Sequence, residues 1–561
     1  MKSRAATFYF LEWESAIYRV SLSFGAIGEH FLLRVNDASV FTDRPFQLRM
    51  PLFFLMGVVF FCAIVDAAEG RRPKRPSTPG RRLKPIEVVD HVVTERPDLE
   101  AVRRADERRE RRGGPYRFAI PRKVLITPWM DGTWEDVDEE SRLWRLHLTA
   151  PGAVSINLGF SRYYMPPGGS MFIYTTDEGH VLGPFTEDDN KKHGQLWTPV
   201  IHSHDIIVEV TVPASELERL ELELSSINHG YRGFRADHKL DKAGGGSGSC
   251  NVNVICPEGD GWRDQIRSVA LYTISGGLQC TGVLVNNTAE DDTPYYLTAF
   301  HCFDPDENEI IENPEQLAAS MVIYWNYQSS SCGDPYGSDG QNQSGATFRA
   351  AYVNSDFALV ELDDEPSMVF DVYYAGWDRS DTAPAGAVAV HHPRGDVKKI
   401  SFEDDPVSIT SYGEDMSPGD GTHLKVADWD LGTTELGSSG SPIFNSSKHI
   451  TGLLHGGTAS CTKPADPDWY GRFECSWTGG GTAATRLSDW LDPNNISGMS
   501  LDGKNPGMDM DDLEFFAPHW LQTDCNDFAG DQTDWCYGTD RTKDYSVNLE
   551  DFAEVAASWQ E

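Results

Sequence analysis

Between residues 115 and 235, apolar and polar residues alternate in short runs, a pattern that predicts β-strands with one buried face. Pro-Gly pairs lie between these runs and indicate turns. The runs that alternate are residues 155–160, 171–174, 206–212 and 220–224. The pattern predicts an antiparallel β-sandwich, and no group of chemically reactive side chains stands out within it.

A different pattern appears at residues 51–65, which are apolar and uncharged. This run is shorter than the roughly twenty residues of a membrane span and suits the core of a signal peptide, with cleavage before Ala68. We therefore assign residues 1–68 to a signal-peptide region. The preceding 49 residues carry no clean fold signal. Met50 is the expected true start, the alternatives being a long leader or a membrane anchor.

The remaining chain divides by composition. Residues 69–114 are rich in Arg, Lys and Pro without apolar periodicity, which predicts a flexible basic linker before the β-rich domain of residues 115–242. Residues 243–501 begin with a Gly/Ser hinge and are rich in Cys, Trp and Gly. Their pattern predicts many short strands and a helix near 483–491. Residues 502–561 are acidic and contain a weak internal repeat.

Composition narrows the function classes. The 561 residues correspond to three or four domains at roughly 150 residues each. The formal net charge of -38 repels nucleic acid, so a DNA or RNA partner is not expected. In an exported chain, the ten cysteines are expected to form disulfides.

Three segments carry candidate chemistry, in the order His…Asp…Ser. They are Leu-Thr-Ala-Phe-His301-Cys, Asn-Ser-Asp356-Phe-Ala-Leu and Gly437-Ser-Ser439-Gly-Ser-Pro. A serine hydroxyl needs a nearby base, and that base needs a carboxylate to hold its tautomer. Glycines around the serine allow a sharp turn in which backbone N–H groups face a developing oxyanion. This order is that of the chymotrypsin fold and differs from the subtilisin and α/β-hydrolase orders.

Residues 245–500 resemble the bacterial lysyl endopeptidase family of serine proteases. The stretches that carry the resemblance include GGSGSCNVNVICPEGDGWRDQIRSVA, CTGVLVNNT, YYLTAFHC, SDFALVEL, VAVHHP, GSSGSPIF, ITGLLHGG and SWTGGGTAATRLSDWLDP. The resemblance implies a mainly β, chymotrypsin-like double antiparallel barrel. It also implies that His301 is the general base, Asp356 its orienting carboxylate and Ser439 the nucleophile. The backbone N–H groups of Gly437 and Ser439 would form the oxyanion hole.

The resemblance also implies a disulfide pattern. The implied pairs are Cys250–Cys461, Cys256–Cys332 and Cys280–Cys302. Cys475 is an additional cysteine, expected to be a buried free thiol or an intermolecular partner. Cys525 and Cys536 are expected to pair with each other near the C-terminus.

Lysine selection requires a fixed negative charge in a deep pocket. The family's selecting aspartate corresponds to Asp468. Asp466, two residues earlier, is the alternative candidate, and a further alternative is that both are surface acids without a role in specificity. His455 and Gly457 would belong to the strand edge that pairs with substrate. Tyr412 stands where family members often have a tryptophan stacked on that histidine. Within the sequence, only the resemblance favours specificity for Lys over Arg.

Lys242 directly precedes the hinge, which suggests self-cleavage there and a pro-domain, inhibitory or folding-assisting, over residues 115–242. Trypsin-like zymogens use an aspartate just before the nucleophile for activation. Ser438 occupies that place here, so that ion pair is not available.

The C-terminal residues have the spacing of a calcium loop followed by a helix, which resembles a dockerin-like module. Tyr545 replaces the usual glycine of such a loop, and a metal-free helical hairpin is the alternative. The candidate ligands are Asp540, Thr542, Asp544, Ser546, Asn548 and Asp551.

The sequence therefore predicts a secreted serine endopeptidase that cuts after lysine, is made as a zymogen and needs no cofactor for catalysis. Its expected partners are protein or peptide substrates, with a cell-surface or scaffold partner for the C-terminal module, and the mature enzyme is expected to be a monomer. The alternatives are the same fold with Arg/Lys or Glu specificity, or a non-catalytic binding protein on a protease fold.

Overall fold

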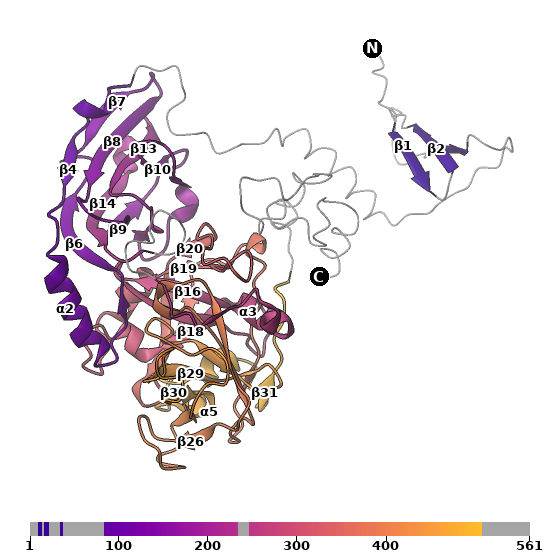
Figure 1. Ribbon diagram of the computed structural model, residues 1–561. Helices are drawn as coiled ribbons and strands as arrows, with labels where there is room; N and C mark the ends of the chain where they lie inside the picture. The colour runs from indigo at the N-terminus through magenta and orange to yellow at the C-terminus, as the bar shows by residue number, and fades with distance from the viewer. Residues whose placement is uncertain (1–8, 14–15, 22–33, 38–82, 234–245, 508–561) are drawn as a thin grey trace. The chain divides into compact units, whose positions relative to one another are not determined.

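The computed structural model describes residues 9–13, 16–21, 34–37, 83–233 and 246–507 (Figure 1). Met1–Gly70 and Arg71–Glu561 are two separate compact units. In the first, β1 (Tyr9–Trp13), β2 (Ala16–Ser21) and β3 (Arg34–Asp37) form an antiparallel sheet that the sequence did not predict. Among the described residues, no helix is both long and apolar enough to cross a membrane.

Several predicted features lie outside the described residues. They are the apolar run at 51–65 with Met50, the processing residue Lys242, the pair Cys525 and Cys536, and the candidate calcium loop at 540–551.

Strands between residues 91 and 230 form a β-sandwich of two sheets, so the predicted antiparallel sandwich is extended at its N-terminal end by β4, which is parallel to β8. One sheet has the order β11-β10-β13-β8-β4 with β7 on β8, and the other has the order β12-β9-β14-β6. Leu146 and Val208 of the first sheet and Leu158 and Leu224 of the second belong to one buried core. The strands are β4 (His91–Val93), β6 (Ala119–Ile126), β7 (Thr133–Asp136), β8 (Ser141–Thr149), β9 (Ser155–Tyr164), β10 (Ser170–Thr175), β11 (Val181–Phe185), β12 (Leu196–Trp197), β13 (Asp205–Pro213) and β14 (Glu221–Gly230).

The flexible linker predicted for residues 69–114 is wrong from residue 83 onward. From residue 83 the chain is folded, and α2 (Leu99–Glu110) begins after the N-cap Asp98, whose side chain accepts the N–H groups of the first turn. The buried carboxylate of Asp106 binds Arg117 and Tyr231. Ionic contacts thus hold this helix where an apolar stripe would normally do so, which is why hydrophobic periodicity did not reveal it.

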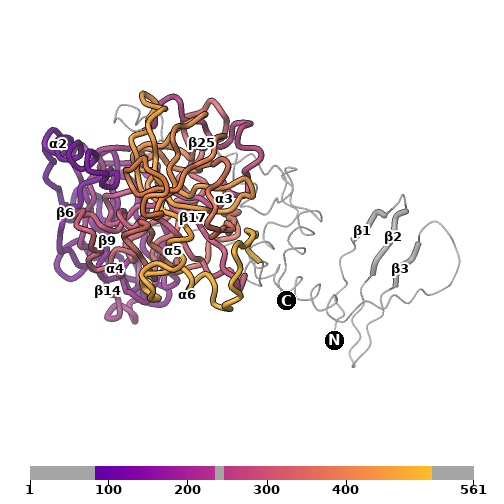
Figure 2. Tube along the Cα trace, turned by 90° about the horizontal axis from the view of Figure 1, so that it is seen from below, coloured from indigo at the N-terminus to yellow at the C-terminus, as the bar shows by residue number. Residues whose placement is uncertain are grey.

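Residues 246–507 contain two sheets whose strands are antiparallel, except that β23 is parallel to β29. The first has the order β20-β19-β16-β17-β18-β22-β21, with β5 (Tyr116–Arg117) added on β17. The second has the order β15-β25-β24-β28-β29-β30-β27-β26, with β23 between β29 and β31. These are the two sheets of the predicted chymotrypsin-like double barrel. In Figures 1 and 2, α2 and β6 in indigo lie to one side of the orange and yellow segments of the second sheet.

The strands of these sheets are β15 (Val252–Asn253), β16 (Val269–Ile274), β17 (Leu278–Leu284), β18 (Tyr295–Ala299), β19 (Val322–Tyr324), β20 (Asn342–Ser344), β21 (Ala346–Tyr352), β22 (Phe357–Leu362), β23 (Trp377–Asp378), β24 (Ala387–His391), β25 (Lys399–Glu403), β26 (Ser408–Thr410), β27 (His423–Val426), β28 (Pro442–Phe444), β29 (Ile450–Gly457), β30 (Asp468–Arg472) and β31 (Ser500–Leu501). The helices are α3 (Arg263–Ser268), α4 (Pro314–Ala319), α5 (Phe473–Thr478) and α6 (Ser488–Leu491). Of the helix predicted near 483–491, only residues 488–491 are helical, as α6. Helix α5 was not predicted.

The three disulfides implied for this domain are confirmed: Cys250–Cys461, Cys256–Cys332 and Cys280–Cys302. Cys475 is a free, half-buried thiol whose pKa is raised to about 12, chiefly by burial, so it stays protonated and unreactive. Past the predicted domain end at 501, the chain still contacts this domain, because Lys504 Nζ lies 2.9 Å from Asp292 Oδ1.

Candidate active site

His301 and Asp356 are brought together by strand pairing. β18 ends at Ala299 and leads into a 3₁₀ turn (Phe300–Phe303) that carries His301, while Asp356 stands just before β22. Because Ala299 is paired with Phe357, the two side chains meet. His301 Nδ1 lies 2.8 Å from Asp356 Oδ2, and the His301 backbone N–H donates to Oδ1 at 2.9 Å.

The electrostatics of this pair keep Asp356 charged. Burial alone would raise the pKa of Asp356, but the neighbouring His301 and His455 and the hydrogen bonds from His301 outweigh it and lower the pKa. A charged carboxylate at Nδ1 holds the proton there and leaves Nε2 as the acceptor. The His301 side chain is 15% exposed, so this nitrogen can be reached from outside.

Ser439 lies in a tight loop between the two sheets. Its C=O accepts the Thr281 N–H of β17 at 2.9 Å, and the Gly440 N–H donates to Leu454 O of β29 at 2.9 Å. Gly440 has a φ of 79°, and a Cβ there would lie 2.2 Å from Thr298 Oγ1, so only glycine fits. The loop is thereby held against β18, which leads to His301. Within the described residues no hydrogen bond joins Ser439 Oγ to His301, a bond that is often long in unliganded enzymes.

The predicted oxyanion donors are on the same loop. Gly437 has a φ of 91°, and its C=O accepts a hydrogen bond from Thr281 Oγ1 at 2.9 Å. In the described part of the chain, neither the Gly437 N–H nor the Ser439 N–H donates to an acceptor. Two backbone donors without a partner beside a candidate nucleophile suit a developing oxyanion.

Ser438, the residue before the candidate nucleophile, is buried in a neutral network. Its hydroxyl lies 2.7 Å from His391 Nδ1 and accepts the Glu435 N–H at 3.2 Å. Burial, assisted by Lys399, lowers the pKa of His391 to about 3, so this histidine is uncharged. The role of His391 was not predicted, because no sequence motif links it to Ser438.

A second aromatic group flanks Asp356. Tyr412 stacks on His455 with ring centroids 3.7 Å apart, which is the predicted contact with tyrosine in place of tryptophan. His455 Nδ1 lies 3.9 Å from Asp356 Oδ2 and 2.9 Å from His423 Nε2. Burial lowers the pKa of both histidines to about 4, so one neutral ring donates to the other. His423 was missed because only the pairing of β27 and β29 on either side of β30 brings its ring to His455.

Asp468 begins β30 and its side chain is buried. Oδ2 accepts hydrogen bonds from Trp429 Nε1 at 2.8 Å and Thr434 Oγ1 at 2.7 Å. Oδ1 accepts no hydrogen bond of ordinary geometry within the described residues, although the Ala459 backbone lies close enough to favour the charged form. Oδ1 faces Gly457, where a Cβ would lie 1.9 Å from it.

The structure distinguishes the two candidate acids. Asp466 lies on the loop, where its carboxylate is 3.4 Å from Lys463 Nζ and its side chain is 38% exposed. Asp468 is instead buried behind Gly457, and burial raises its pKa to about 6 against the two hydrogen bonds. Trp429 and Thr434, which orient this carboxylate, had no signal in the sequence.

An antiparallel double barrel with a buried carboxylate–histidine pair beside a glycine-bounded serine is the architecture of a serine endopeptidase, and this protein is one. Residues 93–231 match the family model described as the lysyl endopeptidase N-terminal domain, and residues 244–471 match the one described as the lysyl endopeptidase C-terminal domain. The chain belongs to the lysyl endopeptidase family, and its substrates are proteins or peptides.

Individual relatives were also found. The chain is 28% identical over 412 residues to a lysyl endopeptidase of Pseudomonas aeruginosa, covering 67% of this chain and 83% of the relative. Among solved structures, an inactive form of Rv3671c from M. tuberculosis H37Rv is 15% identical with a TM-score of 0.25, covering 42% of this chain and 90% of that one. A Glu endopeptidase in complex with MPD is 14% identical with a TM-score of 0.23, covering 37% and 86%.

Proposed function

We propose that this protein is the precursor of an extracellular endopeptidase that cleaves on the carboxyl side of lysine. The observation that carries the specificity is Asp468, a buried carboxylate with one oxygen short of donors. A buried, incompletely paired charge favours a substrate cation and disfavours neutral side chains. The name of the Pseudomonas aeruginosa relative agrees with this specificity.

In the proposed mechanism, Ser439 Oγ attacks the carbonyl carbon after the substrate lysine, while His301 Nε2 takes the hydroxyl proton. Asp356 stabilises the imidazolium, and the N–H groups of Gly437 and Ser439 stabilise the oxyanion. His301 then gives the proton to the leaving amine, which leaves an acyl ester on Ser439. Water, deprotonated by His301, hydrolyses this ester and restores the enzyme.

The geometry of Asp468 favours Lys over Arg. A guanidinium pairs best with both oxygens of a carboxylate through two parallel hydrogen bonds. Here Oδ2 already accepts Trp429 and Thr434, so only Oδ1 is available. A compact ammonium needs no second oxygen. A glutamate side chain would be repelled by the same group, so Glu specificity is not supported.

The precursor form is also part of the proposal, with cleavage after Lys242. The first described residues beyond that site are bound close to the Ser439 loop. The Gly248 N–H donates to Glu435 Oε2 at 2.8 Å, and the Ser247 N–H donates to the buried Asp396 at 2.9 Å. The calcium-binding, dockerin-like role of residues 502–561 remains a proposal from the sequence.

Digestion of a defined peptide library by the processed protein tests the specificity. We expect cleavage after lysine, with arginine sites cut at least about 100-fold more slowly, the scale of losing one charge-assisted hydrogen bond pair. Cleavage sites are read by mass spectrometry. Equal cutting after Arg, or any preference for Glu, would contradict the assignment of Asp468.

The raised pKa of Asp468 predicts a pH-dependent effect on stability. Because the folded protein holds this proton up to about pH 6 and the unfolded chain only to about 4, the contribution of Asp468 to stability is fully present below pH 4 and is lost as the pH rises through 6. Two pKa units correspond to about 3 kcal/mol. Asp468→Asn, neutral at every pH, should therefore raise the Tm at pH 8 clearly more than at pH 4. Thermal melts in the Ser439→Ala background, which cannot digest itself, measure this, and equal shifts at both pH values would refute it.

A further inference from the structure

A short strand from the N-terminal domain is paired with the protease domain. β5 is antiparallel to β17, with Arg117 opposite Leu278 and Tyr116 opposite Gln279. The Phe118 N–H continues the pairing by donating to Gly277 O at 3.0 Å. Gly114, Pro115 and Tyr116 are all buried.

This edge of β17 lies directly beside Ser439. Two residues after Gln279, Thr281 donates its N–H to Ser439 O and its hydroxyl to Gly437 O. The intervening Cys280 is bonded to Cys302, the neighbour of His301. On its other side, the Ser439 loop is held by Leu454 of β29. An extended substrate whose acyl side lies along β29 at His455–Gly457 therefore continues past Ser439 onto β17.

The residues around β5 contact both walls of that path. Arg109 donates to Pro305 O at 3.0 Å, and Arg112 lies 2.9 Å from Glu307, so the end of α2 covers the loop that follows His301. Tyr116 belongs to a buried cluster against which the partly buried Leu436, the residue before Gly437, packs. The segment thus crosses between the oxyanion loop and the loop after His301.

We propose that residues 114–117 occupy the leaving-group side of the substrate cleft, so that the N-terminal domain inhibits the precursor by strand addition to β17. The inference rests on the proposed function and specifies its regulation. The mode is the addition of an extended segment to an exposed strand edge, in which backbone hydrogen bonds supply affinity. Among the described residues, no strand of the N-terminal domain pairs with β29, so the proposal leaves the acyl side of a substrate and the Asp468 pocket free.

The composition of the blocking segment fits a lysine-specific enzyme. Residues 85–122 contain nine arginines and no lysine. An enzyme that cut after arginine would find sites within residues 114–117 and in the stretches of chain on both sides of them. One that cuts only after lysine leaves the segment intact.

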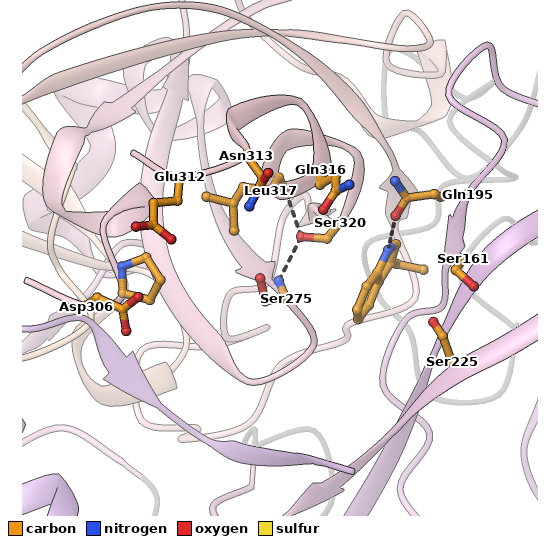
Figure 3. A pocket seen from close by; sticks show the side chains of 12 residues that line it. Ser161, Gln195, Ser225, Ser275, Asp306, Glu312, Asn313, Gln316, Leu317 and Ser320 are labelled. Carbon is orange, nitrogen blue, oxygen red and sulfur yellow. Dashed lines mark hydrogen bonds between the residues drawn. The ribbon is translucent and has the colours of Figure 1, made fainter. Parts of the chain in front are cut away.

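The rest of the interface between the N-terminal domain and the protease domain is polar and incompletely packed, as expected for domains that dissociate. It includes polar pairs such as Lys191–Asp364, His193–Asp363 and His202–Asp339. A cavity of about 480 Å³ remains between Ser161, Gln195 and Ser225 of the sandwich and Asn313, Gln316 and Ser320 of the protease (Figure 3). Interfaces between parts that dissociate are more polar and less completely packed than obligate ones.

Substrate length provides the test. The full-length precursor carrying Lys242→Gln, shown by intact mass to be uncut, is compared with processed enzyme on two substrates. One is a lysyl anilide with residues only on the acyl side, and the other is a peptide with the same acyl residues and three residues after the lysine. We expect anilide hydrolysis within about threefold of the processed enzyme and peptide hydrolysis reduced at least about 100-fold, since a tethered segment has a high effective concentration. Adding Tyr116→Ala to this precursor should restore peptide cleavage and leave anilide cleavage unchanged.

Three results would overturn the inference. Equal loss of both substrates would mean that the domain blocks the acyl side or the catalytic groups. Full activity on both would mean that it blocks nothing. If the processed enzyme itself cuts neither lysyl substrate, the proposed function is wrong and the inference falls with it.

Discussion

Ser439→Ala is expected to abolish peptide hydrolysis, with kcat falling by about 10⁴-fold or more, while the fold is unchanged. The alanine removes the only atom that can form the acyl ester, whereas the loop is held by backbone bonds to Thr281 and Leu454 that do not involve the hydroxyl. Steady-state rates on a lysyl anilide, with thermal melts to verify folding, measure the effect.

Ser441→Ala is the matched control for that experiment. Ser441 belongs to the same motif, but its hydroxyl is buried without a hydrogen-bond partner among the described residues. Removing it should leave the rate within a few-fold of the parent. A large loss with Ser441→Ala and a small one with Ser439→Ala would reverse the assignment of the nucleophile.

Asp468→Asn is expected to reduce kcat/KM for lysyl substrates by about 10²- to 10⁴-fold. Removing one partner of a buried ion pair costs about 3–5 kcal/mol, and each 1.4 kcal/mol corresponds to a factor of ten. Asparagine keeps the size of the side chain, so the change removes charge alone. The reaction of a substrate with a neutral residue in place of lysine should change far less.

Asp466→Asn serves as the control, because this residue stands two positions away on the same loop and is paired with Lys463 at the surface. Its kcat/KM should stay within about threefold of the parent, as for most exposed pairs. If Asp466→Asn proves to be the damaging change, Asp468 is not the specificity residue.

The candidate catalytic residues were predictable because each stands in a short local motif. His301 follows a buried strand and precedes a cysteine, Asp356 precedes another strand, and Ser439 lies between glycines. The disulfide pattern was available only through resemblance, since spacing alone permits fifteen pairings of six cysteines.

Helix α2 shows where local pattern fails. Its residues are mostly charged, and hydrophobic periodicity therefore predicted a flexible linker. The helix is held by Asp106, whose partners are Arg117 in β5 and Tyr231 directly after β14. An ionic contact of this kind has no period along the chain and becomes visible only once the strands are paired.

The sequence by itself determined the alternation that makes the β-sandwich and the motifs of the candidate catalytic residues, and it narrowed the candidate specificity residue to two neighbouring acids, Asp466 and Asp468. Only the tertiary structure distinguishes those acids, because they differ in burial behind Gly457 and in contact with Trp429 and Thr434. It also brought His423 to His455 and laid Tyr116 against β17. These contacts join residues far apart in the chain, so their energies depend on strand register and packing, which no local pattern of residue types encodes.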